Sequence, residues 1–171
     1  SLGSAGAIGS SGTITVGGGV LQYTSSNNTD YSARFSTAAS QAYNIDTNGR
    51  SVTFAGALSS AGGTLTKLGS GTLTLAGANS YTGDTTIGAG TLRLIDSGVL
   101  GSGNYSGAIA NSGTLQYSST SAQTLSGIIS GTGLLIKDGD VSTLSLTGQN
   151  TFNGNIIVDT GTLQVGGSGR L

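Results

Sequence analysis

The stretch TLTLAGANSYTGDTTIGAGTL at residues 72–92 returns as TLSLTGQNTFNGNIIVDTGTL at residues 143–163. Every position of the first stretch has a counterpart in the second at a constant offset, so Thr72 corresponds to Thr143 and Leu92 to Leu163. Strand residues, glycines, one asparagine and one aromatic residue keep their places while the residues between them change. A spaced pattern of this kind is typical of a structural repeat, whose stability comes from stacking of neighbouring units. The structural repeat positions are Leu73, Leu75, Asn79, Tyr81, Gly83, Gly90 and Leu92 in the first copy, and Leu144, Leu146, Asn150, Phe152, Gly154, Gly161 and Leu163 in the second.

Short runs that alternate a hydroxyl residue with an aliphatic one recur along the whole chain. Examples are residues 13–16 (TITV), 64–66 (TLT) and 91–94 (TLRL). In a strand, this alternation places the aliphatic side chains on one face and the hydroxyl groups on the other. Glycine-rich corners such as residues 69–71 separate the runs, and no segment of helical length keeps a helical period. The sequence therefore predicts an all-β fold.

Two architectures suit strands this short: an antiparallel sandwich or barrel, and a β-solenoid in which each coil lies parallel to the next. Hairpins favour Asn-Gly or Asp-Gly turns, and only residues 48–49, 138–139 and 153–154 have that sequence. The solenoid is therefore favoured, with about 20–25 residues per coil and roughly seven or eight coils. Like residues can then stack in ladders, so Asn79 with Asn150, and Tyr81 with Phe152, are expected to recur at fixed corners.

The chain is interpreted as a single segment, residues 1–171, built from two long units at about 2–98 and 100–170. Leu2 and Leu171 fall in the same register of the repeat. Residues 63–67 match residues 133–137 at an offset that is shorter by one, which indicates a one-residue insertion near Asp140-Val141. Residues 25–51 have little counterpart in the second unit, so they form either an extra coil or an excursion from the stack.

Residues 63–92, GTLTKLGSGTLTLAGANSYTGDTTIGAGTL, closely resemble the passenger-associated, or autotransporter-associated, β-strand repeat. Residues 133–163 resemble it less closely, because residues 137–142 carry an insertion and Phe152 replaces the tyrosine. The two copies cover about a third of the chain. The resemblance implies a right-handed parallel β-helix in the exported passenger of an autotransporter, or in another large bacterial surface protein. It therefore implies an extracellular location at the bacterial cell surface.

The residue inventory argues against catalysis. The chain has no histidine, cysteine or glutamate, and its seven acidic residues are scattered aspartates, so the usual acid–base and nucleophile sets are missing. We therefore predict that the protein is not an enzyme and uses no cofactor. Asp138 and Asp140 are the closest acidic pair and could supply two oxygen ligands to calcium. The favoured interpretation is a polar corner, with no metal bound.

Two surface-binding interpretations compete with a purely structural one. The Thr-x-Thr pairs, such as Thr64 and Thr66, resemble the flat ice-binding faces of some β-solenoids, but Arg93 and Gln116 interrupt the array. Tyrosines could also form a platform for sugars. We favour corner or core-edge roles for most of them, because Tyr81 corresponds to the apolar Phe152 of the second copy. The six tyrosines are Tyr23, Tyr31, Tyr43, Tyr81, Tyr105 and Tyr117.

The sequence predicts a non-enzymatic structural stalk or adhesin passenger segment. The alternative is a self-assembling subunit or repeat of an extracellular fibre or sheath, because an uncapped solenoid exposes strand edges at both ends. Expected partners are further repeats of the same polypeptide or identical chains stacked end to end, and a host-cell or neighbouring-cell surface or a polysaccharide. The net charge of −1 and the thinly spread basic residues argue against nucleic acid. The longest apolar runs are too short to cross a bilayer, so no direct membrane insertion is expected.

Overall fold

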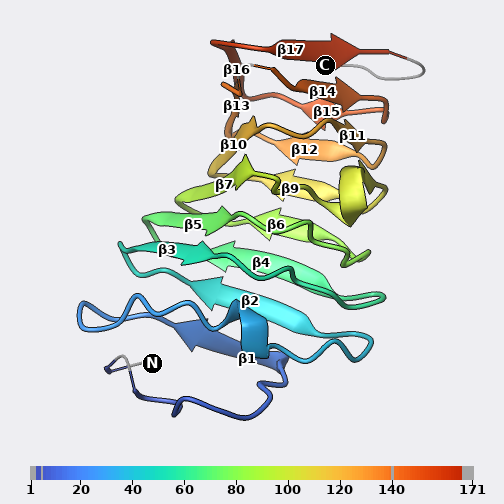
Figure 1. The fold of residues 1–171 in the computed structure, drawn as a ribbon. Helices are drawn as coiled ribbons and strands as arrows, with labels where there is room; N and C mark the ends of the chain where they lie inside the picture. Colours follow the sequence, from blue (N-terminus) through green and yellow to red (C-terminus); the bar gives the residue numbers. More distant parts are fainter. Residues whose placement is uncertain (1–2, 5, 140, 167–171) are drawn as a thin grey trace.

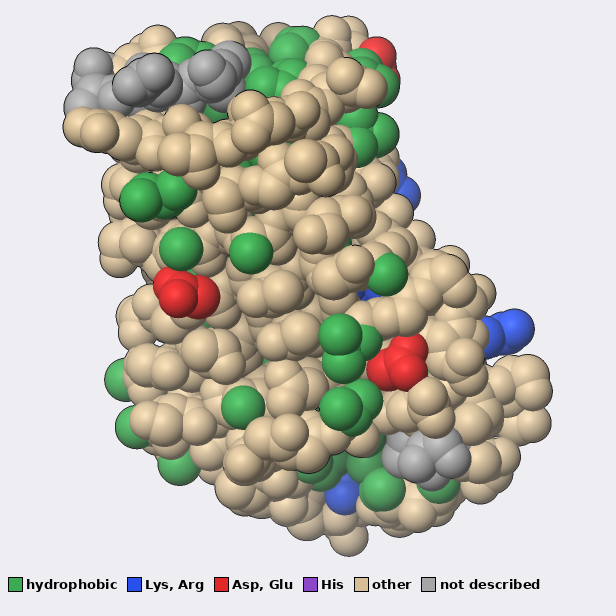
Figure 2. Space-filling view, turned by 180° about the vertical axis from the view of Figure 1, so that it is seen from behind, with side chains coloured by type: hydrophobic (Ala, Val, Ile, Leu, Met, Phe, Trp, Pro, Cys, Tyr) green, Lys and Arg blue, Asp and Glu red, His purple; other side chains and the backbone are tan. Residues whose placement is uncertain are grey.

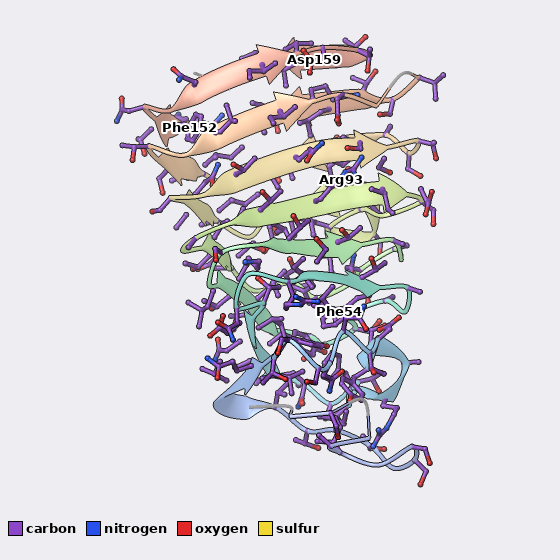
Figure 3. The ribbon with its side chains drawn as sticks, turned by 90° about the vertical axis from the view of Figure 1, so that its left-hand side faces the viewer. Phe54, Arg93, Phe152 and Asp159 are labelled. Atoms are coloured by element: carbon purple, nitrogen blue, oxygen red, sulfur yellow. The ribbon has the colours of Figure 1, made fainter. Side chains whose placement is uncertain are left out.

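The structure is a computed structural model that describes residues 3–4, 6–139 and 141–166. The chain winds into a β-solenoid of about seven turns, which rises from β1 at one end to β17 at the other (Figure 1). In Figure 3 the strands of the nearest sheet run from left to right while the chain climbs, so the coil is right-handed. Every pairing between strands of the described part is parallel, which confirms the predicted solenoid and excludes the antiparallel sandwich.

In the described residues, three parallel sheets form the walls of the solenoid. Sheet 1 contains β1 (Gly17–Gln22), β2 (Ala42–Asp46), β4 (Thr64–Leu68), β6 (Thr85–Ile87), β9 (Ile109–Asn111), β12 (Ile129–Gly131) and β15 (Thr151–Phe152). Sheet 2 contains β3 (Ser51–Phe54), β5 (Thr72–Leu75), β7 (Thr91–Asp96), β10 (Thr114–Ser119), β13 (Leu134–Lys137) and β16 (Asn155–Val158). Sheet 3 contains β8 (Asn104–Tyr105), β11 (Gln123–Leu125), β14 (Thr143–Leu146) and β17 (Thr162–Val165). The 3₁₀ turns η1 (Ser32–Arg34) and η2 (Gly101–Gly103) lie between strands.

Sheet 2 shows how one turn stacks on the next (Figure 3). Leu73 pairs with Leu92, Leu92 with Leu115, and Leu115 with Leu135. Each step rises by one turn of the coil, and each of these leucines is at most 2% exposed. Burying one such leucine contributes about 1.5–3 kcal/mol, so each turn adds to the stability of this wall through the continuous aliphatic column. The two-residue alternation of the sequence thus sets which side chains face inward.

Residues 25–51 contain η1 and β2, and β2 lies between β1 and β4 in sheet 1. Val20 of β1 pairs with Asn44 of β2, so the chain between them completes one turn of the coil. Its interior is aromatic: the rings of Phe35 and Tyr43 have centroids 5.6 Å apart. Leu2, Leu171 and Asp140, which entered the sequence predictions, lie outside the described residues. Within the described ranges, no helix is both long and apolar enough to span a membrane.

Candidate functional site

The two copies of the repeat occupy different faces of the solenoid. β4 and β6 of the first copy lie in sheet 1, whereas their counterparts β13 and β16 lie in sheet 2. In the same way β5 and β7 lie in sheet 2, and their counterparts β14 and β17 lie in sheet 3. The offset between the copies, which takes Thr72 to Thr143, therefore equals three turns and one further face.

The expected ladder between equivalent residues of the two copies is therefore wrong. Asn79 and Asn150 are three turns and one face apart, so they cannot stack. Tyr81 lies instead against Tyr105, with ring centroids 5.7 Å apart, while Phe152 lies on β15. The physical reason is that successive turns differ in length according to their corners, and the offset between the copies is not a whole number of turns.

The two asparagines make the same contact at different corners. The side-chain oxygen of Asn79 accepts the backbone N–H of Leu58 at 2.9 Å, and that of Asn150 accepts the N–H of Ile129 at 2.8 Å. In both cases the donor lies in the turn below, so each asparagine ties its corner to that turn. The amide nitrogen of Asn79 also donates to the carbonyls of Gly77 and Val99. A buried amide can satisfy backbone groups where the ladder of strand hydrogen bonds stops.

The leucine positions of the repeat line the interior. Leu163 in the last turn is only partly covered, because it lies on β17, the last strand of sheet 3. Among the leucines at the repeat positions named above, those with no exposed surface are Leu73, Leu75, Leu92, Leu144 and Leu146.

The glycine positions lie where backbones of adjacent turns approach closely. A Cβ atom on Gly83 would lie 2.6 Å from the carbonyl oxygen of Gly63, and one on Gly154 would meet Gly133 even more closely. Gly90 and Gly161 in addition have φ values of +65° and +72°, which side chains rarely tolerate. These positions therefore require glycine for space, and the last two require it for conformation as well.

The tyrosines do not form a sugar platform. All six are at most 2% exposed, so their rings belong to the core. Tyr81 and Tyr105 share a buried network in which the Thr85 hydroxyl lies 2.7 Å from the first phenol oxygen and 2.8 Å from the second. Burial raises the pKa of Tyr105 to about 12 and raises that of Tyr81 well above its ordinary value. These phenols are structural hydrogen-bonding groups.

The carboxylates of Asp30 and Asp138 accept hydrogen bonds from groups of the protein itself. The two carboxylate oxygens of Asp30 accept the backbone N–H groups of Ser32 and Ala55, each at 2.8 Å. The carboxylate of Asp138 accepts hydrogen bonds from the side-chain amide nitrogen of Gln116 at 2.7 Å and from the hydroxyl group of Ser118 at 2.5 Å. In the described part of the chain, no group of three or more potential metal ligands comes together. Asp140, the second member of the predicted acidic pair, lies outside that part.

A hollow of about 520 Å³ beside η1 is lined by Asp30, Tyr31 and Arg34, together with Thr29 and residues of the 6–10 segment. Its charged groups already have partners within the protein. Arg34 donates to the carbonyl oxygens of Gly9 at 2.8 Å and Gly12 at 2.9 Å, and Asp30 is occupied by backbone amides. The hollow therefore offers neither a free carboxylate nor a free guanidinium for a ligand.

The outer surface is weakly charged and uneven in chemistry. Figure 2 shows a few separated acidic and basic side chains, with small apolar groups between them. On sheet 2, the outward positions Thr74, Arg93 and Gln116 are in register, so the threonine array is interrupted there. The more exposed large apolar residues are Val20, Ile128, Val141, Ile157, Val158 and Val165.

Sequence reasoning missed two inward-facing charged residues, Lys67 and Lys137, both of which are fully buried. The signal was present in the alternation. Leu65 faces inward, so Lys67, two positions later in the same strand, must also face inward; Leu135 and Lys137 repeat the relation.

The family model described as "Passenger-associated-transport-repeat" matches residues 65–94 and 135–165. The chain therefore carries two copies of this repeat, which confirms the resemblance seen in the sequence. Among curated proteins, the "Adhesin BmaC autotransporter" of Brucella suis biovar 1 (strain 1330) is 36% identical over 157 residues. The match covers 84% of this chain but 4% of the adhesin, so the chain spans a small part of its relative's length. No solved structure matches the chain.

Proposed function

We infer that this chain, with its two passenger-associated transport repeats, is a rod segment in the passenger of an autotransporter adhesin at the bacterial cell surface. In this role it is non-enzymatic and extracellular, and it holds adhesive regions of a longer polypeptide away from the cell. The curated relative is named an adhesin, and it is far longer than the chain, which supports a segment role.

The uninterrupted stack of turns is the observation that carries this proposal. Sheet 1 alone runs through seven strands in parallel register, with leucines and aromatic side chains filling the interior. Stacked coils at a spacing of about 4.8 Å give seven turns a length of roughly 30 Å. Because each turn is held by its neighbours, such a rod is stiff along its axis and lengthens simply by adding turns.

The end of the stack at β15, β16 and β17 supports continuation by further coils. Among the described residues, no strand pairs with the outer edges of β15, β16 and β17, and Val158 and Val165 are more than 40% exposed there. We propose that coils of the same polypeptide cover this end, and that stacking of identical chains is not its normal state. The small share of the relative that the chain covers favours this arrangement.

Competition in a cell-adhesion assay tests the stalk role. Bacteria that carry the parent adhesin are allowed to bind host or neighbouring cells in the presence of excess purified chain. A stalk segment leaves binding unchanged, because the receptor site lies elsewhere in the polypeptide. Dose-dependent inhibition by the folded chain, absent with the heat-unfolded chain, would show that this segment itself binds the receptor.

The assembly state is tested separately on the purified chain. Sedimentation at rising concentration should show a monomer, or small reversible oligomers that reflect the exposed end strands. Long filaments that form at low concentration, seen by negative-stain microscopy, would favour the fibre or sheath alternative over the stalk.

A further inference from the structure

Two lysine side chains lie inside the solenoid. Lys67 lies near the end of β4 and Lys137 ends β13, and neither has any exposed surface. They are also the only two lysines in the sequence, at corresponding places in the two repeats. Lysine is almost never fully buried unless its charge has partners. The contacts of the two ammonium groups therefore indicate why the residue is needed.

The ammonium group of Lys67 joins two turns. Its Nζ donates to the carbonyl oxygens of Leu68, the last residue of β4, at 2.8 Å and of Gly69, in the corner that follows, at 2.7 Å. It also donates to the carbonyl of Ala89 at 3.2 Å, which lies in the corner of the next turn. An ammonium group has three N–H donors, and these three carbonyls match them in number.

Lys137 repeats this arrangement one face further round. Its Nζ donates to the carbonyl oxygen of Gly139 in its own corner and to that of Thr160, at 3.4 Å, in the corner above. It also lies 5.8 Å from the centre of the Tyr117 ring in the turn below. A cation over an aromatic face gains further electrostatic stabilisation.

A glycine in the turn above makes room for each ammonium group. A Cβ atom on Gly90 would lie 2.9 Å from Nζ of Lys67, and one on Gly161 would lie 2.5 Å from Nζ of Lys137. Each glycine follows its lysine in the sequence by about one turn of the coil. In each repeat, the lysine side chain therefore needs a glycine, Gly90 or Gly161, at the facing position of the turn above.

The charges around Lys67 are few. Burial lowers its pKa to about 8, and the opposing influence is Asp46 on the turn below, which favours the protonated form. The corner above, Gly88-Ala89-Gly90, has no titratable side chain. The three carbonyl oxygens also favour the ammonium form, because they can only accept hydrogen bonds. At neutral pH the group in the cage is therefore a cation.

We propose that Lys67 and Lys137 are internal clamps that hold each corner of the repeat to the corner above it. Each ammonium group donates hydrogen bonds to backbone carbonyl oxygens of two successive turns and so connects them. The clamp explains why the strand pattern tolerates an inward lysine, and it is independent of whatever the passenger binds.

Matched substitutions test the proposal. Lys67→Met keeps the length of the side chain and removes the cation, and Lys137→Met does the same at the other corner. Amide exchange is measured at Gly88 and Thr91, above the first lysine, and at Asp159 and Thr162, above the second. Lys67→Met should speed exchange at the first pair by about tenfold or more, and leave the second pair unchanged. Lys137→Met should do the reverse. Equal acceleration of both pairs by either variant, or no acceleration, would overturn the clamp.

A second measurement uses the unaltered chain, in case a variant does not fold. An acylating reagent for amines labels a lysine only when its clamp opens, and mass spectrometry follows the two lysines separately. The opening equilibrium constant obtained from the labelling of Lys67 should equal the one obtained from amide exchange at Gly88 and Thr91. Labelling at the rate of a free lysine in the native protein, while those amides stay protected, would also overturn the proposal.

Discussion

Asn79 shows how much of this fold depends on single polar side chains at corners. It is fully buried, and its amide group satisfies the N–H of Leu58 and the carbonyls of Gly77 and Val99. The Leu58 N–H lies outside the named strands and depends on this side chain, whereas the Val99 carbonyl also accepts the backbone N–H of Asn79. Asn150 repeats the contact to the turn below, which gives a physical reason for the asparagine in each copy.

Replacing Asn79 by alanine should therefore destabilise the chain strongly. Asn79→Ala leaves the Leu58 N–H buried without its acceptor, which costs about 1–3 kcal/mol of unfolding free energy. Asn153→Ala is the matched control, because Asn153 is exposed, and it should change stability by about 0.5 kcal/mol or less. Urea unfolding of both variants measures the difference. Equal midpoints would contradict the capping role.

The buried titratable groups predict a stability maximum in the alkaline range. Between pH 8 and 10.5 the unfolded chain holds a proton that folded Lys67 has lost, so stability should rise with pH. Tyr81 and Tyr105 keep their protons to higher pH in the folded chain than their ordinary pKa of 10.0, so stability should fall above pH 10. Lys67→Met should abolish the rise and keep the fall. Thermal melting across this pH range measures both, and a wild-type profile without a rise would refute the assignment to Lys67.

At the scale of elements, the corners set the geometry and the strands follow. Gly88 and Gly90 lie in the same corner between β6 and β7, yet they differ in what they require. Gly90 has a φ of +65°, and a Cβ atom there would clash with the carbonyl oxygen of Gly71. The nearest contact of a Cβ on Gly88 is an ordinary 3.6 Å. A corner therefore tolerates change at one glycine and not at the other.

This contrast predicts different outcomes for two alanine substitutions. Gly90→Ala should cost about 1–3 kcal/mol, because it adds both backbone strain and a clash with the turn below. Gly88→Ala should lie within roughly 1 kcal/mol of wild type and can even be stabilising, since it reduces the freedom of the unfolded chain. Denaturant midpoints of the two variants decide the matter. A larger loss for Gly88→Ala would show that the corner is built differently.

The sequence predicts the elements better than their placement around the axis. The alternation at Leu73 and Leu144 gives the correct inward face, because a strand offers only two faces. The sequence could not predict that the second copy lies one face further round than the first. The length of each turn depends on its corners, and the pattern of strand residues does not reveal that length. The charge of Lys67 suggests that its side chain is exposed to solvent. Lys67 is, however, two residues after the inward-facing Leu65 in the same strand, and it therefore also faces inward.

At the scale of the whole molecule, the repeat and the coil have different periods. Equivalent residues of the two copies face directions one sheet apart, so features carried by the repeat spiral around the rod. A passenger of such repeats would display them on all three faces in turn. The stack itself depends only on parallel pairing between successive turns, which is why the two copies can differ in their corners without breaking it.

Paired cysteines test the parallel stacking most directly, because the native chain contains no cysteine. Thr91 of β7 is paired with Thr114 of β10, and both side chains lie on the outer face of sheet 2. Neighbouring strands lie close enough for a disulfide to form between such positions. Parallel pairing of β7 with β10 predicts rapid crosslinking in Thr91→Cys/Thr114→Cys and none in Thr91→Cys/Ser118→Cys. Crosslinking of the second pair in place of the first would mean that the strands run antiparallel, and the solenoid would be wrong.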